Sequence, residues 1–257
     1  MLEEQTEQDS HSESSPRPRF LQIADTIRNQ IAGGALAAHD ILPSERSLSE
    51  QYKVSRMTAR RALEALENEG LVYSTERRGR FVSPGRLKYN VSKMVSFVAN
   101  AQAHNVDLKI DVIEAVESTA DARLATLLEQ PEGSDIIEYT RLFHSGAHPI
   151  FIETEYLPAA RFPGFLEHDL RQSTTRILDQ GYGTSANTGD IVIRMRGVHA
   201  TEARLLSIAA SHTVIELEQV IRDQAGVPFC FGRQVWRGEL AEFSAHAVVT
   251  RQNPDKA

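Results

Sequence analysis

Residues 42–82 of this 257-residue chain read LPSERSLSEQYKVSRMTARRALEALENEGLVYSTERRGRFV, and their hydrophobic pattern shows how this part of the chain folds. The middle of the stretch predicts a helix over residues 56–69, because apolar residues recur there at the spacing of a helix that buries one face: Ala59, Ala62, Leu63 and Leu66. Ser55 is the expected N-cap of this helix, and Gly70 is a natural stop.

The residues on either side complete a small domain. Apolar residues at helical spacing predict a first helix over residues 20–31, and Ser44 can cap a second helix. After the third helix, two short β-type runs at 71–73 and 81–82 are joined by a polar loop, which predicts a β-hairpin. Three short helices and a hairpin make a winged helix-turn-helix, which we expect to span residues 19–84.

The net charge of −7 is distributed unevenly along the chain. Residues 20–86 hold ten Lys or Arg against eight acids, a net charge of +2, whereas residues 1–19 carry −3 and residues 87–257 carry −6. A basic segment within an acidic protein suggests that only this segment faces phosphate.

The predicted helix over residues 56–69 has the charge distribution of a recognition helix. Arg56 and Arg60 are one turn apart and away from the apolar positions, so they project from the same exposed face. The acidic residues follow in its second half: Glu64, Glu67 and Glu69. A helix that enters the major groove by its N-terminal end needs this arrangement, because its basic half meets phosphates and guanine edges. The same charges would also suit an amphipathic helix whose outer face meets only water.

Residues 42–82 resemble the winged-helix domain of the GntR family of bacterial regulators, whose pattern contains L-P-S-E-R, V-S-R-x-T-[VA]-R-x-A-L, E-G-L-[VI] and a glycine in the wing. The resemblance implies DNA contacts at the matching positions, which are Ser44, Arg46, Ser55, Arg56, Thr58, Arg60, Arg61, Arg78 and Gly79. Among them, the arginines at 46, 56 and 60 would contact bases or phosphates, Thr58 the DNA backbone and Gly79 the minor groove. Arg80 stands where the family commonly has threonine, and with Arg77 and Arg78 it suggests a stronger non-specific attraction to phosphate.

The rest of the chain alternates helical and strand patterns. Helices are expected over residues 92–105, 119–129, 170–180 and 200–208, and strands over residues 107–115, 136–143, 149–156, 185–198, 213–222 and 228–237. Neighbouring strands joined by short turns must be antiparallel. We therefore expect an α+β protein of two domains, in which residues 91–250 surround a largely antiparallel sheet. Residues 85–90 are the expected linker, and residues 1–18 and 251–257 are expected to be flexible tails.

Composition bounds the chemistry of the second domain. Cys230 is the only cysteine, and we find no metal-binding, catalytic or phosphate-cradling motif, so we expect no metal, no cofactor and no enzymatic activity. No run of about 18 apolar residues could span a membrane, and the acidic N-terminus is unlike a signal peptide, so we expect a cytoplasmic protein. Four charged residues interrupt strand patterns and could bind a ligand or simply face solvent: Arg141, Glu153, Arg194 and Arg196.

Residues 90–250 resemble the UTRA effector domain of the HutC subfamily of GntR regulators, which is similar in fold to chorismate lyase. The matching segments are Ile137–Arg141, His148–Glu153, Tyr156–Pro158, Asp169–Leu170 with Ser173, Thr201–Ala203 with Leu205–Leu206, and Trp236–Glu239 ahead of Phe243. The resemblance implies a small, usually anionic metabolite as effector. Arg141 and Ser173 would hold its anionic group, and Glu153 a hydroxyl or an ammonium group. The further effector-binding positions that we expect are Thr175, Arg194, Cys230 and Trp236.

Three positions depart from the pattern of sugar-phosphate-binding family members. Phe143 stands in place of an arginine, Cys230 in place of a glutamate and Trp236 in place of a tyrosine. The loss of one positive charge and one carboxylate argues against an amino-sugar phosphate. A phosphonate, an aromatic or imidazole-type acid, or another small carboxylate remain open.

The resemblance further implies a homodimer that binds a palindromic operator in double-stranded DNA and is released by the effector, as a repressor is. Two alternatives remain. A constitutive DNA-binding protein would use the second domain only for dimerisation. A chorismate-lyase-like enzyme would use that domain for catalysis, although fold alone does not carry function.

Overall fold

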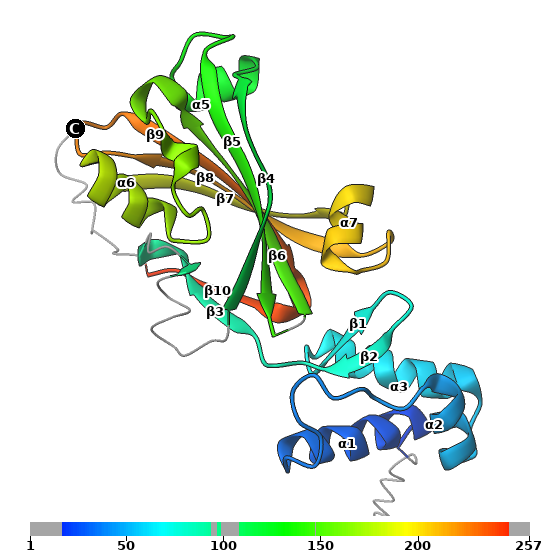
Figure 1. The fold of residues 1–257 in the computed structure, drawn as a ribbon. Coiled ribbons are helices and arrows are strands. Elements are labelled where there is room, and N and C mark those ends of the chain that lie inside the picture. Colours follow the sequence, from blue (N-terminus) through cyan, green and yellow to red (C-terminus); the bar gives the residue numbers. More distant parts are fainter. Residues whose placement is uncertain (1–16, 94–96, 99–107, 147, 247–257) are drawn as a thin grey trace, which may run out of the picture.

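The computed structural model describes residues 17–93, 97–98, 108–146 and 148–246, and it contains a winged helix-turn-helix followed by an α+β domain (Figure 1). The predicted fold class is confirmed. The tail expected over residues 1–18 lies outside the described residues except for Arg17 and Pro18, and the tail expected over residues 251–257 lies wholly outside them. Among the described helices, none combines the length and the apolar character needed to cross a lipid bilayer.

The winged domain consists of α1 (Arg19–Ala32), α2 (Glu45–Tyr52), α3 (Arg56–Asn68), β1 (Val72–Thr75) and β2 (Gly79–Val82). Ser44 and Ser55 cap α2 and α3 as predicted, because each hydroxyl oxygen accepts a hydrogen bond from the backbone N–H three residues later, at 3.1 Å. The helices share one core, whose buried members include Ile23, Leu48, Ala59, Ala62, Leu63 and Leu66. Burial of each leucine or isoleucine contributes roughly 1.5–3 kcal/mol.

The second domain is built on a six-stranded antiparallel sheet with the strand order β4-β5-β6-β9-β8-β7. Its strands are β4 (Leu108–Thr119), β5 (Asp135–Ser145), β6 (His148–Pro158), β7 (Thr188–Gly197), β8 (Thr213–Arg222) and β9 (Pro228–Arg237). Helix α6 (Thr174–Tyr182) covers one face of the sheet, and α5 (Ala122–Leu128) and α7 (Ala200–Leu206) cover the other (Figure 1). The described part also contains the 3₁₀ helices η1 (Val91–Lys93), η2 (Ala159–Arg161), η3 (Phe165–Glu167) and η4 (Gly238–Leu240).

Strand register places a row of polar side chains across the middle of the sheet. Arg141 on β5 pairs with Glu153 on β6, which pairs with Gln234 on β9. Since side chains alternate between the two faces of a strand, all three share the α6 face, whereas Leu142 and Ile152 face α7. The polar row is therefore covered by protein on the α6 side.

The segment expected to be a linker contains a strand. Residues Leu87–Asn90 form β3, which pairs in parallel with β10 (Ala241–Ser244), so these residues are part of the second domain's structure. Tyr89 on β3 is 5% exposed, and its ring lies 6.0 Å from that of Trp236. Most of the helix expected over residues 92–105 lies outside the described residues, which show here only η1 and helical backbone at residues 97–98.

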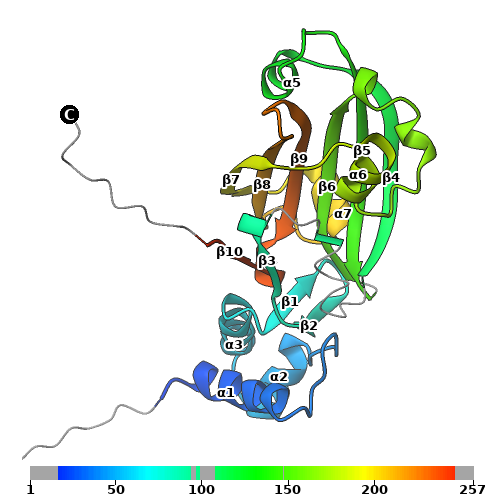
Figure 2. The same cartoon turned by 90° about the vertical axis from the view of Figure 1, so that its left-hand side faces the viewer.

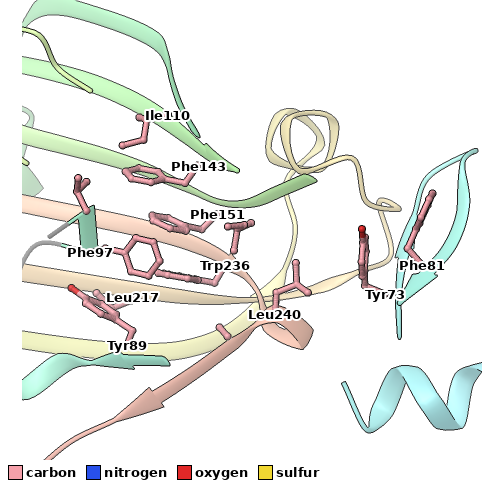
Figure 3. Close-up of a cluster of buried hydrophobic side chains, with 13 residues drawn as sticks. Tyr73, Phe81, Tyr89, Phe97, Ile110, Phe143, Phe151, Leu217, Trp236 and Leu240 are labelled. Carbon is pink, nitrogen blue, oxygen red and sulfur yellow. The ribbon is translucent and has the colours of Figure 1, made fainter. Parts of the chain in front are cut away.

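The wing hairpin packs against the second domain (Figure 2). Tyr73 and Phe81 on the wing belong to the same buried apolar cluster as Tyr89, Phe143 and Trp236 (Figure 3). Within this cluster, the rings of Phe143, Phe151 and Trp236 stack in sequence, with centroids 4.1 Å and 3.9 Å apart.

Polar and aromatic contacts reinforce this packing between the domains. Arg237 at the end of β9 donates a hydrogen bond of 2.8 Å to the carbonyl oxygen of Ser74, and its guanidinium lies 4.9 Å from the ring centre of Tyr73. His39 and His148 stack with ring centroids 4.3 Å apart. The wing is thus held by residues at the end of the sheet that faces it.

Candidate nucleic-acid interface and ligand pocket

A groove lies between α2, the start of α3 and the wing. Five of the residues predicted to contact DNA line it: Ser44, Arg46, Arg56, Arg78 and Gly79. Within the described part of the chain, neither Arg56 nor Arg78 forms an ion pair or a side-chain hydrogen bond, so both guanidinium groups are available to an anion. The backbone at Gly79 has a φ of +106°, which favours glycine at the tip of the wing.

Two further predicted arginines are exposed but paired. Arg46 donates to Glu50 and Arg60 donates to Glu64, at 2.9 Å and 2.8 Å, each along one turn of its own helix. Exposed pairs of this kind contribute only about 0.3–0.5 kcal/mol, so either arginine can leave its partner for a phosphate at little cost.

Other side chains that were predicted to face DNA contact protein groups in this structure. The Arg61 guanidinium lies 5.0 Å from the ring centre of Phe20 on α1, and the Thr58 hydroxyl hydrogen-bonds with the Ser55 hydroxyl at 2.9 Å. Arg80 is 19% exposed in its side chain and pairs with Glu45 and Glu67 at 2.9 Å and 3.6 Å. Arg80 also lines the groove, but two carboxylates hold its guanidinium against α2 and α3 in this conformation, so the phosphate role suggested for it stays a prediction.

Sequence reasoning missed one residue on the exposed face of α3. Met57 is 62% exposed, although it is large and apolar, and it lies next to Arg56 in the turn that opens the helix. An apolar residue in the polar half of a recognition helix was the signal that could have found it. Such a side chain can contact the methyl group of thymine.

The second domain contains a pocket between the sheet and α6. Its cavity volume is about 30 Å³, roughly the space that one water molecule occupies in the liquid, so a metabolite would have to displace some of the lining side chains. Its polar lining residues include Arg141, Glu153, Glu155, Thr174, Thr175 and Gln234, and its aromatic ones are Tyr89, Phe97 and Phe143. The structure therefore brings together three residues predicted from the sequence, Arg141, Glu153 and Thr175.

Arg141 is 3% exposed, and both of its terminal nitrogens are held by protein groups, whereas its Nε has no hydrogen-bond partner within the described residues. Its Nη1 donates to the carbonyl oxygens of Leu170 and Gln172, and its Nη2 donates to Glu153, Glu155 and Thr174. Burial opposes the charge of the guanidinium, but the carboxylates of Glu153 and Glu155 outweigh it and raise the pKa of Arg141.

Glu155 is the pocket residue that the sequence analysis missed. Its carboxylate accepts hydrogen bonds from the Tyr139 and Thr174 hydroxyls as well as from Arg141. The signal was its position two residues after Glu153, which places both side chains on the same face of β6.

Four predicted effector contacts lie outside the pocket lining. Ser173 caps α6 and hydrogen-bonds with the Thr175 hydroxyl at 3.0 Å, and the Cys230 thiol lies behind Glu155, 3.6 Å from its Oε1. The indole of Trp236 donates to Gln234 at 2.9 Å from beneath the pocket. Arg194 is on the other face of the sheet, where it pairs with Glu216 and Glu218, so its assignment to the pocket was wrong.

A winged DNA-binding domain joined to an α+β domain with an internal pocket defines a two-domain DNA-binding regulator. Residues 20–82 match the bacterial regulatory proteins of the GntR family, and residues 103–242 match the UTRA domain. The chain belongs to the GntR family, in the HutC subfamily that carries a UTRA domain, which confirms the resemblance seen in the sequence.

Individual relatives agree with this assignment. NagR, an HTH-type transcriptional repressor of Bacillus subtilis, is 27% identical over 90% of this chain and 96% of its own length. A histidine utilization repressor of Klebsiella aerogenes is 31% identical over 63% of this chain and 67% of its own length. The crystal structure of PhnF from Mycobacterium smegmatis has a TM-score of 0.64 at 25% identity, over 89% of this chain and 100% of that chain.

Proposed function

We propose that the protein is a transcriptional repressor that binds a palindromic operator as a homodimer and leaves it when a small metabolite fills the pocket of the second domain. The observation that carries the proposal is the groove between α3 and the wing, where Arg56 and Arg78 have no partner within the described residues. The names of NagR and of the histidine utilization repressor support the assignment as a repressor.

Operator binding would use the groove residues in different ways. Arg56 is positioned at the N-terminal end of α3, where a planar guanidinium can contact the O6 and N7 atoms of guanine. Arg78 and Gly79 on the wing would lie at the minor groove. Arg46 and Arg60 would exchange Glu50 and Glu64 for phosphates, which makes the affinity dependent on salt.

The effector would bind between α6 and the sheet. Thr175 lines the pocket in the first turn of α6, where helix geometry favours a negative charge, and Ser173 orients its hydroxyl. We therefore place the expected anionic group of the effector at this end of α6. Arg141 would act by positioning Glu153 and Glu155, since both terminal nitrogens of its guanidinium are already engaged.

Strand β9 offers a physical link from the pocket to the wing. Gln234 donates to Glu153 at 2.8 Å and accepts a hydrogen bond from Trp236, and Arg237, three residues further on, donates to Ser74 of the wing. We propose that effector binding displaces Gln234 and thereby favours one of two arrangements of the winged domains. Effector and operator would then lower each other's affinity by the same factor.

The experiment starts from the full-length protein and a random pool of duplexes. Selection should recover an inverted repeat, fluorescence anisotropy should show tighter binding to it than to random duplex, and light scattering should give the mass of a dimer. A thermal-shift screen of metabolites then supplies ligands, and a true effector must weaken operator binding. Equal affinity for selected and random duplex at moderate salt would overturn the proposal, and a ligand that leaves operator affinity unchanged would overturn the release mechanism.

We further propose that the second domain acts by binding and not by catalysis, and that the protein works in the cytoplasm, where its operator lies. The family and the relatives are transcriptional regulators, which supports the first point. The lone buried thiol of Cys230 suits a reducing compartment.

A further inference from the structure

The pocket contains more negative than positive charge. Among its described lining residues, the charged ones are Arg141, Glu153 and Glu155, so two carboxylates face one guanidinium. All three are at least nine-tenths buried, and they lie side by side on β5 and β6. A buried charge is costly unless it is paired, so this excess of one carboxylate requires a proton or a cation.

Among the charged groups of the pocket, the Nε of Arg141 is the donor without a hydrogen-bond partner within the described residues, whereas two carboxylate oxygens have room for further hydrogen bonds. The terminal nitrogens of Arg141 are engaged by two backbone carbonyls, two carboxylates and Thr174. Within the described part of the chain, in contrast, Oε1 of Glu153 accepts only from Gln234, at 2.8 Å, and Oε1 of Glu155 has only the weak thiol donor of Cys230, at 3.6 Å. Each carboxylate oxygen has room for two hydrogen bonds, so both glutamates can accept from a ligand.

The remaining wall suits the same kind of ligand. Tyr89 and Phe143 line the pocket together with Phe97 and have their rings in the same aromatic cluster (Figure 3). Aromatic faces attract a positively charged nitrogen, and they repel an anion. The ring of Phe143 already contacts the Arg141 guanidinium and Phe151, so Tyr89 and Phe97 are the aromatic lining residues that could contact a cationic group near the carboxylates.

We infer that the effector carries a positively charged nitrogen, such as a primary ammonium or an amidinium, which is held by Glu153 and Glu155 against the aromatic wall. The inference rests on the proposed function, because it concerns the ligand of that regulator's pocket. The anionic group proposed for the first turn of α6 would make the whole ligand a zwitterion. Glu155 is the residue that distinguishes this pocket from one built only for an acid.

The position of Glu155 also changes an argument made from the sequence. The glutamate missing at Cys230 spoke against an amino-bearing ligand, but Glu155 places a carboxylate in contact with that thiol. The carboxylate lost on β9 is thus replaced by one on the adjacent strand β6. The preference for a purely acidic effector does not follow once both strands are considered.

The ionisation of Glu153 is consistent with an unfilled cation site. Burial raises the pKa of Glu153, Arg141 lowers it, and the neighbouring Glu155 carboxylate raises it, with a net increase. The other polar groups near it within the described residues include Gln234 and the Cys230 thiol on β9 and the phenol of Tyr89 on β3. A bound ammonium group would stabilise the ionised carboxylate, so binding should release protons wherever part of Glu153 is protonated in the free protein.

The test uses matched probes on the full-length protein. Thermal shift and calorimetry compare a panel of primary amines with carboxylates and alcohols of the same carbon skeleton, for example phenethylamine, 3-phenylpropionate and phenethyl alcohol. We expect stabilisation by members of the amine series alone, and proton release measured in two buffers of different ionisation enthalpy. Binding confined to the carboxylates, or no binding by any amine up to 10 mM, roughly the weakest affinity that such a screen detects, would overturn the inference.

Two isosteric variants localise the effect. Glu155→Gln and Glu153→Gln keep the shape of the side chain, and each should weaken amine binding by about 30-fold or more, because a buried charge partner is lost. Glu138→Gln on the opposite face of β5 removes the same charge and should leave binding unchanged. Equal affinity of all three variants and the parent protein would overturn the inference. Operator binding, measured in parallel, reports on the proposed function independently, since it does not depend on which ligand series binds.

Discussion

Arg56→Ala is the substitution that most directly probes the DNA interface. The Arg56 side chain has no partner within the described residues, so its removal should change the free energy of unfolding by less than about 0.5 kcal/mol. If its guanidinium contacts a guanine, operator binding should weaken by about 1–3 kcal/mol, which is roughly 5-fold to 150-fold in affinity. A large loss of binding with no loss of stability is the expected combination.

The assay is fluorescence anisotropy with the selected operator and with random duplex, repeated over a series of salt concentrations. A base contact predicts reduced discrimination between the two duplexes, whereas a phosphate contact predicts a uniform loss and a salt slope that falls by about one. Arg171→Ala removes an exposed arginine of the second domain and serves as the charge-matched control. A folded Arg56→Ala protein that binds the operator within twofold of the parent would refute the placement of α3 in the DNA.

Three further outcomes follow from other contacts. Arg80→Thr breaks partly buried ion pairs to Glu45 and Glu67, so urea denaturation should show a free energy of unfolding lower by about 1–3 kcal/mol. The control Arg77→Ala removes an exposed side chain and should leave that free energy unchanged. A urea midpoint of Arg80→Thr equal to that of the parent protein would mean that the ion pairs do not stabilise the fold. Burial, with the help of His39, lowers the pKa of His148 to about 4, whereas the unfolded chain has a pKa of about 6.5 for this group. Between these two values the unfolded state binds a proton that the folded state does not bind. The free energy of unfolding should therefore decrease as the pH falls from 6.5 towards 4. NMR titration of the imidazole checks this, and a midpoint near 6.5 would contradict it. Burial and the Glu155 and Glu153 carboxylates raise the pKa of the Cys230 thiol. The thiol should therefore react with Ellman's reagent far more slowly in the native protein than in urea. A native rate equal to that of free cysteine would exclude such burial.

In the winged domain, local sequence patterns predicted most of the secondary structure. The caps at Ser44 and Ser55, the apolar face of α3 and the hairpin after Gly70 were all predicted, because each depends on residues within a few positions of one another. The family resemblance had assigned Arg56, Arg78 and Gly79 to DNA contact, and the structure brings all three to one groove. The ion pairs of Arg80 were missed because Glu45 lies 35 residues away.

In the second domain, local sequence patterns did not predict which residues come together. Its strands were predicted from alternation, but their order was not, and the order decides that Arg141, Glu153 and Gln234 lie in one row while Arg194 lies on the other face. Likewise, the pairing of β3 with β10 joins two ends of the domain.

The sequence by itself determined most of the helices and strand segments and the charge of each region, because these depend on neighbouring residues, whereas β3 and β10 were not predicted. Only the tertiary structure decided the net charge of the pocket, since Glu155 meets Arg141 and Cys230 across three adjacent strands. Long-range register brings these groups within hydrogen-bonding distance, and no local periodicity encodes it.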